Sequence, residues 1–183
     1  QSVVNSVVLE PFLLINTNEN MLAFANGQPI PNIINNIFVP TFGMVGGTGS
    51  TISLLIAIFI FSRQKSAKQV ARLSLAPGLF NINEPVIFGL PIVFNLPLMI
   101  PFVLLPAIGI YFAWLCTTLG LMSRCVVMIP WTTPPILSAW LATAGDWRAV
   151  VVQLAIIVFG VFFYLPFLKI AERVALKNSG IEN

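Results

Sequence analysis

The chain has 183 residues, of which 57% are hydrophobic and 8% are charged, and it carries a formal net charge of +3. Soluble domains have about 25% charged residues, so this composition excludes a soluble domain and indicates an integral membrane protein. Strict alternation of polar and apolar residues is absent, which argues against a transmembrane β-barrel and predicts an all-α fold.

The polar segment 20–36 near the start of the chain is not predicted to cross the membrane. Residues 1–15 are apolar around Glu10 and Pro11, and residues 16–36 form a polar, asparagine-rich connection. The chain begins without Met and without the basic segment of a signal peptide. We therefore expect it to be a fragment of a longer transporter.

A glycine-rich turn precedes the strongly apolar run 52–61. Glycines let backbone amides approach a ligand closely, and the N-terminus of a following helix favours anions. Gly46, Gly47 and Thr48 are therefore candidates for backbone contacts to a phosphate or a sugar. Small residues are equally typical of close helix packing in membranes, so both interpretations stay open.

Glu84 is the first candidate for a functional side chain, because no other charged residue lies between Arg72 and Arg124. A charge at hydrocarbon depth costs about 2.5–3.5 kcal/mol on insertion scales, so it normally faces a cavity and serves transport or chemistry. Prolines and glycines on both sides break any helix there. Irregular backbone survives at that depth only inside protein or along a water-filled site. We predict that Glu84 contacts the substrate and acts in catalysis.

Asn81 and Asn83 accompany Glu84 in the broken segment. Their amides, together with the carboxylate, supply the donors and acceptors that bind the vicinal hydroxyls of a sugar. Carbohydrate is therefore the ligand class that fits. The alternative for all three residues is an internal role, in which their side chains form a hydrogen-bonded cap that holds the broken helix together.

A third broken segment, 129–136, contains prolines, Trp131 and Thr132. An indole ring can stack on the apolar face of a pyranose, so Trp131 and Thr132 are predicted to bind substrate. The alternative for Trp131 is the aromatic belt at the membrane interface.

Charge asymmetry predicts the orientation, because cytoplasmic loops are enriched in Lys and Arg. Both basic clusters are therefore placed in the cytoplasm: Arg63, Lys65, Lys68 and Arg72 in one, and Lys169, Arg173 and Lys177 in the other. These cations are explained by topology, so no nucleic-acid partner is expected.

The number of full crossings between two cytoplasmic clusters must be even. Residues 98–122 and 149–168 are each long enough, at about 20 apolar residues, to cross the hydrocarbon core. That leaves 74–97 and 125–145 as re-entrant or half-spanning segments. The expected fold is an all-α integral membrane protein with transmembrane helices, re-entrant helical hairpins and broken segments.

Metal and cofactor chemistry is not expected. Cys116 and Cys125 are nine residues apart, and the chain has no His, so neither a redox pair nor a zinc site is available. Both cysteines are interpreted as small apolar residues. No nucleotide-binding or hydrolase motif occurs.

Three motifs resemble the enzyme IIC subunits of the bacterial phosphoenolpyruvate-dependent phosphotransferase system (PTS), in the lactose/cellobiose/diacetylchitobiose family. The principal one is 75–101, around Asn81-Ile-Asn-Glu-Pro85. The others, in the same order as in the family, are Val45-Gly-Gly-Thr-Gly-Ser-Thr51 and Pro130-Trp-Thr-Thr-Pro-Pro-Ile-Leu137. The resemblance implies that 1–183 is the C-terminal, substrate-binding part, without the N-terminal helices.

The resemblance also implies group translocation, in which an entering β-linked disaccharide is phosphorylated on a 6-hydroxyl by a phosphocysteine of enzyme IIB. The essential Glu of the family motif falls on Glu84, with Asn83 beside it, and the family Trp falls on Trp131. Neither Cys116 nor Cys125 is the phosphorylated cysteine. The family His precedes the stretch that resembles residues 1–9, so this chain alone is expected to be inactive.

Further expectations concern the oligomeric state, the cellular location and the substrate. Family members are homodimers in the bacterial cytoplasmic membrane, with several crossings. Lactose, cellobiose and diacetylchitobiose stay open as substrates. The alternatives are a proton-coupled secondary sugar transporter, with Glu84 as the proton carrier, and a membrane scaffold for a partner protein.

Overall fold

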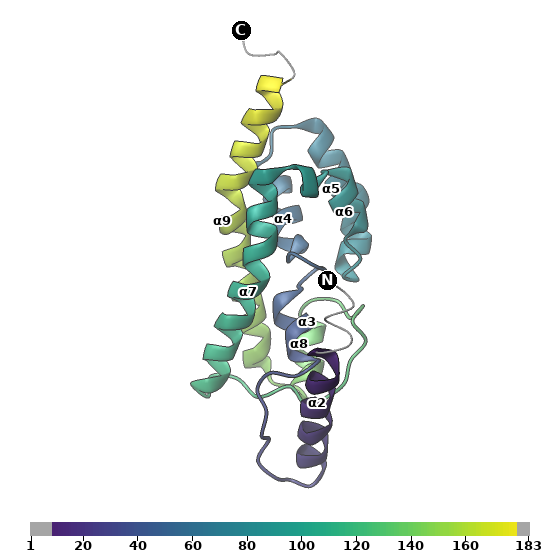
Figure 1. The fold of residues 1–183 in the computed structure, drawn as a ribbon, viewed down its shortest axis with the longest axis vertical. Coiled ribbons are helices and arrows are strands. Elements are labelled where there is room, and N and C mark those ends of the chain that lie inside the picture. The colour runs from purple at the N-terminus through teal and green to yellow at the C-terminus, as the bar shows by residue number, and fades with distance from the viewer. Residues whose placement is uncertain (1–8, 179–183) are drawn as a thin grey trace.

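The computed structural model describes residues 9–178, and every regular element within them is a helix (Figure 1). The prediction of an all-α fold is thus confirmed. The elements are α2 (Glu10–Ala25), α3 (Phe38–Gly43), α4 (Thr51–Phe61), α5 (Lys65–Leu79), α6 (Glu84–Gly89), the 3₁₀ helix η2 (Ile92–Phe94), α7 (Leu96–Thr118), α8 (Leu137–Ala142) and α9 (Trp147–Asn178).

Two helices among the described residues are long and apolar enough to cross a membrane, Leu96–Thr118 and Trp147–Ala175. Only 28% and 33% of their most apolar stretches are buried, so neither resembles the enclosed core helix of a soluble domain. They coincide with the two predicted crossings and pack side by side (Figure 1).

The first of these crossings, α7, ends earlier than the predicted residue 122. Gly120 has a φ of 73°, and the Leu121 N–H donates to the Cys116 carbonyl at 2.9 Å. The Gly120 N–H donates to the Thr117 carbonyl at 3.1 Å, which completes a Schellman motif. A left-handed glycine therefore stops the helix at Thr118.

The two basic clusters lie at the same end of the molecule, as the charge asymmetry predicted (Figure 1). The Ser62 hydroxyl, just before α5, donates a hydrogen bond to the Glu172 carboxylate near the end of α9. Gln64, Asn95 and Glu172 also line one small hollow. The start of α5, the start of α7 and the end of α9 therefore meet there.

Residues 65–95 form a hairpin, because Gln64 and Asn95 lie at the same end and α5 contacts α6. The chain reverses after α5, where Asn81 adopts a φ of 62° and the Ile82 N–H donates to the Pro77 carbonyl at 3.0 Å. Pro77 and Gly78 are accommodated in the last turn of α5, and the break follows them.

Residues 125–145 form a second hairpin. The N–H groups of Val126 and Val127 donate to the Ala142 carbonyl at 2.8 and 3.2 Å, which closes its base. The tip is the proline-rich segment 130–136, and α8 leads back. Both predicted non-crossing segments thus turn back on themselves.

The asparagine-rich connection predicted over 16–36 is helical in its first part, since α2 continues to Ala25. Asn20, fully buried in this helix, donates to the carbonyls of Asn32 and Cys125 at 2.8 and 3.1 Å. A polar residue lies inside a helix here because its amide joins the helix to two other segments.

Candidate functional site

The glycine-rich turn 44–50 joins α3 to α4 and allows an unusually close approach of neighbouring segments. Gly46, Gly47 and Gly49 have φ values of 77°, 98° and 81°, which L side chains rarely adopt. A Cβ atom on Gly49 would lie 2.2 Å from the Phe102 ring, and one on Gly47 would lie 2.7 Å from Asn83 Cγ. The glycines are therefore needed for packing.

Asn81, at the tip of the first hairpin, joins the three broken segments. Its Oδ1 accepts a hydrogen bond from the Gly46 N–H at 2.8 Å. Its Nδ2 donates to the carbonyls of Trp131 at 2.6 Å and Thr133 at 3.0 Å. The two hairpin tips and the glycine-rich turn thus meet at one side-chain amide.

Asn83 makes a second link between the first hairpin and the turn. Its side chain is 5% exposed, and its Nδ2 donates to the Thr48 carbonyl at 2.6 Å. Both asparagines therefore make internal hydrogen bonds of the kind that the sequence left open, and substrate contact by either stays a prediction. Both Nδ2 hydrogens of Asn81 are already committed to protein carbonyls.

The residues of the turn that are predicted to contact a phosphate or sugar have backbone groups that are already engaged in hydrogen bonds. The Gly46 N–H is bonded to Asn81, the Gly47 N–H donates to the Met44 carbonyl at 2.9 Å, and the Thr48 carbonyl accepts from Asn83. These groups hold the turn together, which favours the packing interpretation over an anion cradle.

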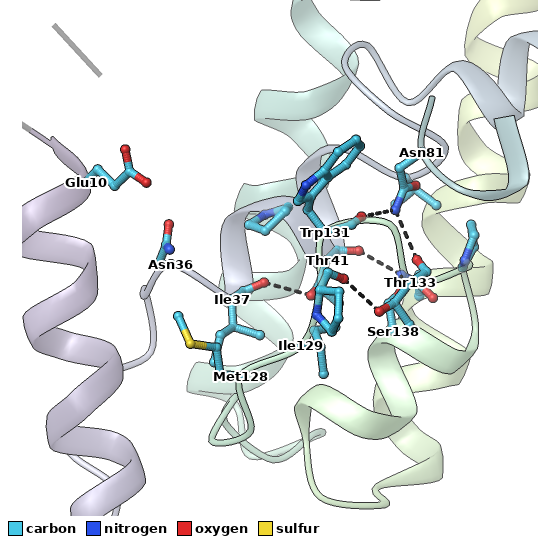
Figure 2. A pocket seen from close by; sticks show the side chains of 15 residues that line it. Glu10, Asn36, Ile37, Thr41, Asn81, Met128, Ile129, Trp131, Thr133 and Ser138 are labelled. Atoms are coloured by element: carbon cyan, nitrogen blue, oxygen red, sulfur yellow. Dashed lines mark hydrogen bonds between the residues drawn. The ribbon is translucent and has the colours of Figure 1, made fainter. Parts of the chain in front are cut away.

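A cavity of about 640 Å³ lies beside this junction (Figure 2). Asn81 and Trp131 line it, and Trp131 keeps 64% of its surface exposed. Figure 2 shows Glu10 and Asn36 on the α2 side and Trp131 with Asn81 on the other. The remaining polar lining comes from Thr41, Thr133, Ser138 and Gln153. The cavity combines an aromatic ring with amide, hydroxyl and carboxylate groups, which suits a sugar.

Glu84 lies on the same hairpin tip but outside the lining of this cavity. It is the first residue of α6, its side chain is exposed, and no described residue forms a hydrogen bond or an ion pair with its carboxylate. Thr132, which is half-buried, also does not line the cavity. Substrate contact by both residues stays a prediction.

The sequence interpretation missed Gln153, Ser138 and Asn36 as cavity residues. Gln153 had a visible signal, since it is the single amide in the uncharged run 149–168. Asn36 had none, because Asn32 and Asn35 are equivalent neighbours in the sequence, and Ser138 had none, because a lone Ser beside an apolar run indicates no particular role. Glu10 was visible as a lone acid in an apolar stretch.

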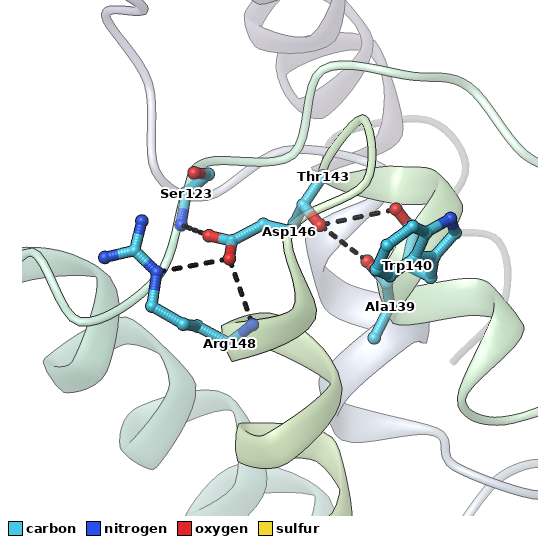
Figure 3. Close-up of polar contacts among 6 residues, drawn as sticks. All are labelled: Ser123, Ala139, Trp140, Thr143, Asp146 and Arg148. Carbon is cyan, nitrogen blue, oxygen red and sulfur yellow. Dashed lines mark hydrogen bonds and ion pairs between the residues drawn. The ribbon is translucent and has the colours of Figure 1, made fainter.

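A polar cluster around Asp146 lies at the start of α9, the end of this helix away from the basic clusters (Figures 1 and 3). Its carboxylate accepts from the Ser123 N–H at 2.7 Å, the Arg148 N–H at 3.0 Å and Arg148 Nε at 3.2 Å. Burial raises the pKa of Asp146, but these hydrogen bonds outweigh it and hold the pKa below its usual value. The cluster fixes the start of α9 to the loop after α7.

No group of three His, Cys, Asp or Glu side chains within 9–178 could hold a metal ion. Cys116 and Cys125 are free, buried thiols in one apolar cluster with Phe38 and Phe42. They occupy the place of small apolar residues, as predicted.

Comparison with known proteins identifies a family. The family model described as "Phosphotransferase system, EIIC" matches residues 1–106, more than half of the chain. The cellobiose-specific EIIC component of Lactococcus lactis subsp. lactis (strain IL1403) is 46% identical over 133 residues, covering 73% of this chain and 27% of that protein. The oligo-beta-mannoside-specific EIIC component of Bacillus subtilis (strain 168) is 37% identical over 179 residues, covering 96% of this chain and 40% of that protein.

A solved structure is similar over nearly the whole chain. The crystal structure of the transporter ChbC, the IIC component from the N,N'-diacetylchitobiose-specific phosphotransferase system, matches with a TM-score of 0.91 and 36% identity. The match covers 97% of this chain and 41% of that one. The chain thus spans between about a quarter and two fifths of the length of these three proteins.

Proposed function

Because the chain belongs to the phosphotransferase system EIIC family, we propose that it is the sugar-contacting part of a permease that takes up and phosphorylates a β-linked disaccharide. The permease is a multi-pass homodimer in the bacterial cytoplasmic membrane. Its partner is phosphorylated enzyme IIB, which reaches the basic end of the molecule. Some relatives carry both parts in one chain, such as the lactose-specific EIICB component of Staphylococcus aureus.

One observation carries the proposal: the Asn81 amide holds the Trp131 segment against the first hairpin at the edge of a large, partly polar cavity. The indole of Trp131 supplies a stacking face for a sugar ring. Glu10 and Asn36 supply hydrogen-bonding groups on other walls. Cellobiose is the first sugar to test, because a cellobiose-specific relative is 46% identical.

Glu84 is proposed as the residue that acts on the reacting hydroxyl. The sugar 6-oxygen attacks the phosphorus of the IIB phosphocysteine, an O–P bond forms, and the S–P bond breaks with release of the thiolate. The hydroxyl proton passes to the Glu84 carboxylate. Phosphoryl transfer depends mostly on positioning and electrostatic stabilisation, so a carboxylate that orients the nucleophile is the contribution expected from this subunit.

Family membership favours this proposal over a proton-coupled transporter that uses Glu84 as proton carrier. The test uses the full-length parent in vesicles with the general PTS proteins and enzyme IIB, following radiolabelled cellobiose. We expect phosphorylated sugar inside, dependent on phosphoenolpyruvate and indifferent to an uncoupler. Accumulation of unmodified sugar that collapses with the uncoupler would overturn the proposal.

A further inference from the structure

Gln153 of α9 is a buried amide with three hydrogen bonds to two other segments. Its side chain is 1% exposed and lines the cavity. Nε2 donates to the Thr41 carbonyl at 2.7 Å and to the Ser138 hydroxyl oxygen at 2.9 Å. Oε1 accepts from the Ile136 N–H at 2.6 Å. Both donors and one acceptor site of the amide are thus engaged.

These bonds need an amide of this length. A Glu has at most one hydrogen to donate where the Gln153 amide donates two, a Leu can neither donate nor accept, and an Asn is one methylene shorter. A buried polar group without its partner is costly, so any of these changes leaves uncompensated groups in the cavity wall. The interaction is specific to glutamine.

The segment held in this way carries Trp131. At its tip, Asn81 binds the carbonyls of Trp131 and Thr133. At its end, Gln153 binds the N–H of Ile136, which has a φ of 76°. A β-branched residue rarely adopts that backbone conformation and keeps it only where its surroundings impose it. Gln153 is the side chain that binds Ile136 directly.

We propose that Gln153 is a positioning residue for sugar binding, an inference that rests on the proposed function. It fixes the Trp131 segment relative to α3 and α9 and so sets the place of the indole in the cavity. Gln153 is buried in the cavity wall and does not take part in phosphoryl transfer. Sugar affinity therefore depends on an amide in a membrane-spanning helix.

The test compares variants of the full-length parent in phosphoenolpyruvate-dependent phosphorylation of cellobiose. For Gln153→Leu we expect KM for cellobiose to rise about tenfold, with kcat and KM for enzyme IIB nearly unchanged. For Ser138→Ala, which removes one bond of the three, we expect a smaller rise in KM, about threefold. A purely structural defect would instead lower the active fraction, and hence the apparent kcat, at constant KM.

Asn20→Leu is the matched control. Asn20 is likewise a fully buried amide with three hydrogen bonds, to Asn32 O, Asn32 N and Cys125 O, but it does not line the cavity. We expect the Asn20→Leu substitution to lower the thermal stability of the protein and to leave KM for cellobiose unchanged. Equal KM values for wild type, Gln153→Leu and Ser138→Ala would overturn the inference, as would an equal KM rise in the control.

Ser138→Ala keeps the inference testable if Gln153→Leu does not fold, since an unchanged KM in that variant alone contradicts it. Failure of the proposed function has a different signature. The wild type itself would then show no phosphoenolpyruvate-dependent phosphorylation of β-disaccharides.

Discussion

Asn81 and Glu84 lie three residues apart on one hairpin tip, yet their side chains have opposite surroundings. Asn81 is hydrogen-bonded to three backbone groups of two other segments. Glu84 is exposed and has no polar partner among the described residues. The first side chain is suited to holding the site together, and the second remains available to a ligand.

Glu84→Gln in the full-length parent is expected to lower kcat for sugar phosphorylation by about 100-fold, because the amide cannot accept the hydroxyl proton. The overall fold should be retained, since the residue is exposed. The measurement is phosphoenolpyruvate-dependent phosphorylation of cellobiose by purified protein.

Glu19→Gln is the control for loss of a carboxylate. The Glu19 carboxylate accepts a hydrogen bond from the Asn32 amide on the surface of α2, away from the hairpin tips. The Glu19→Gln change should therefore leave phosphorylation unaltered. Wild-type rates in Glu84→Gln would remove Glu84 from the mechanism.

At the scale of elements, the site is built from interrupted helices that interlock. The glycine-rich turn between α3 and α4, the tip of the α5–α6 hairpin and the proline-rich tip before α8 exchange side-chain to backbone hydrogen bonds. Several of their freed backbone groups, including the Gly46 N–H and the Trp131 carbonyl, are thus satisfied within protein, as irregular backbone at membrane depth requires.

Gly47→Ala tests this interlocking. The added Cβ would lie 2.7 Å from Asn83 Cγ and 2.8 Å from the Asn81 carbonyl oxygen, so the turn must move away from the hairpin. We expect at least a tenfold loss of sugar phosphorylation. We also expect a lower melting temperature, measured by thermal unfolding of the protein in detergent.

Gly120→Ala separates backbone strain from the clash. Gly120 has a similar left-handed φ of 73°, but a Cβ there meets nothing within 4 Å. It should therefore cost only the conformational penalty of about 1–2 kcal/mol and leave phosphorylation unchanged. Equal effects of the two substitutions would argue against interlocking as the cause.

At the scale of the whole molecule, α7 and α9 form an apolar pair, with a basic end and an opposite end that carries the Asp146 cluster (Figures 1 and 3). The basic end gathers residues from α5 and α9, held together by Ser62 and Glu172. The positive-inside rule predicts that this end faces the cytoplasm.

The orientation is testable with a membrane-impermeant maleimide on intact cells. Arg148→Cys, at the Asp146 end, should react from outside. Ser66→Cys, at an exposed position of α5 near the basic end, should react only after the cells are permeabilised. Cys116 and Cys125 are buried and serve as unreactive internal controls. The reverse labelling pattern would invert the topology.

The sequence by itself determined the features that depend on composition and short-range order. Low charge indicated a membrane protein, long uncharged runs placed both crossings, and clustered Lys and Arg predicted which ends share a side. Prolines and glycines located the breaks around Asn81, Gly46 and Trp131. Each of these properties acts within a few turns of chain, so it can be recognised without knowledge of the packing.

The tertiary structure alone showed which groups the polar side chains contact. Asn81 and Gly46 are 35 residues apart, Asn81 and Trp131 are 50, and Gln153 and Thr41 are 112. A side-chain amide can hold backbone or bind a sugar with the same donors and acceptors. Only the partners that folding brings within hydrogen-bonding distance distinguish these roles, and no local pattern records partners so distant in the chain.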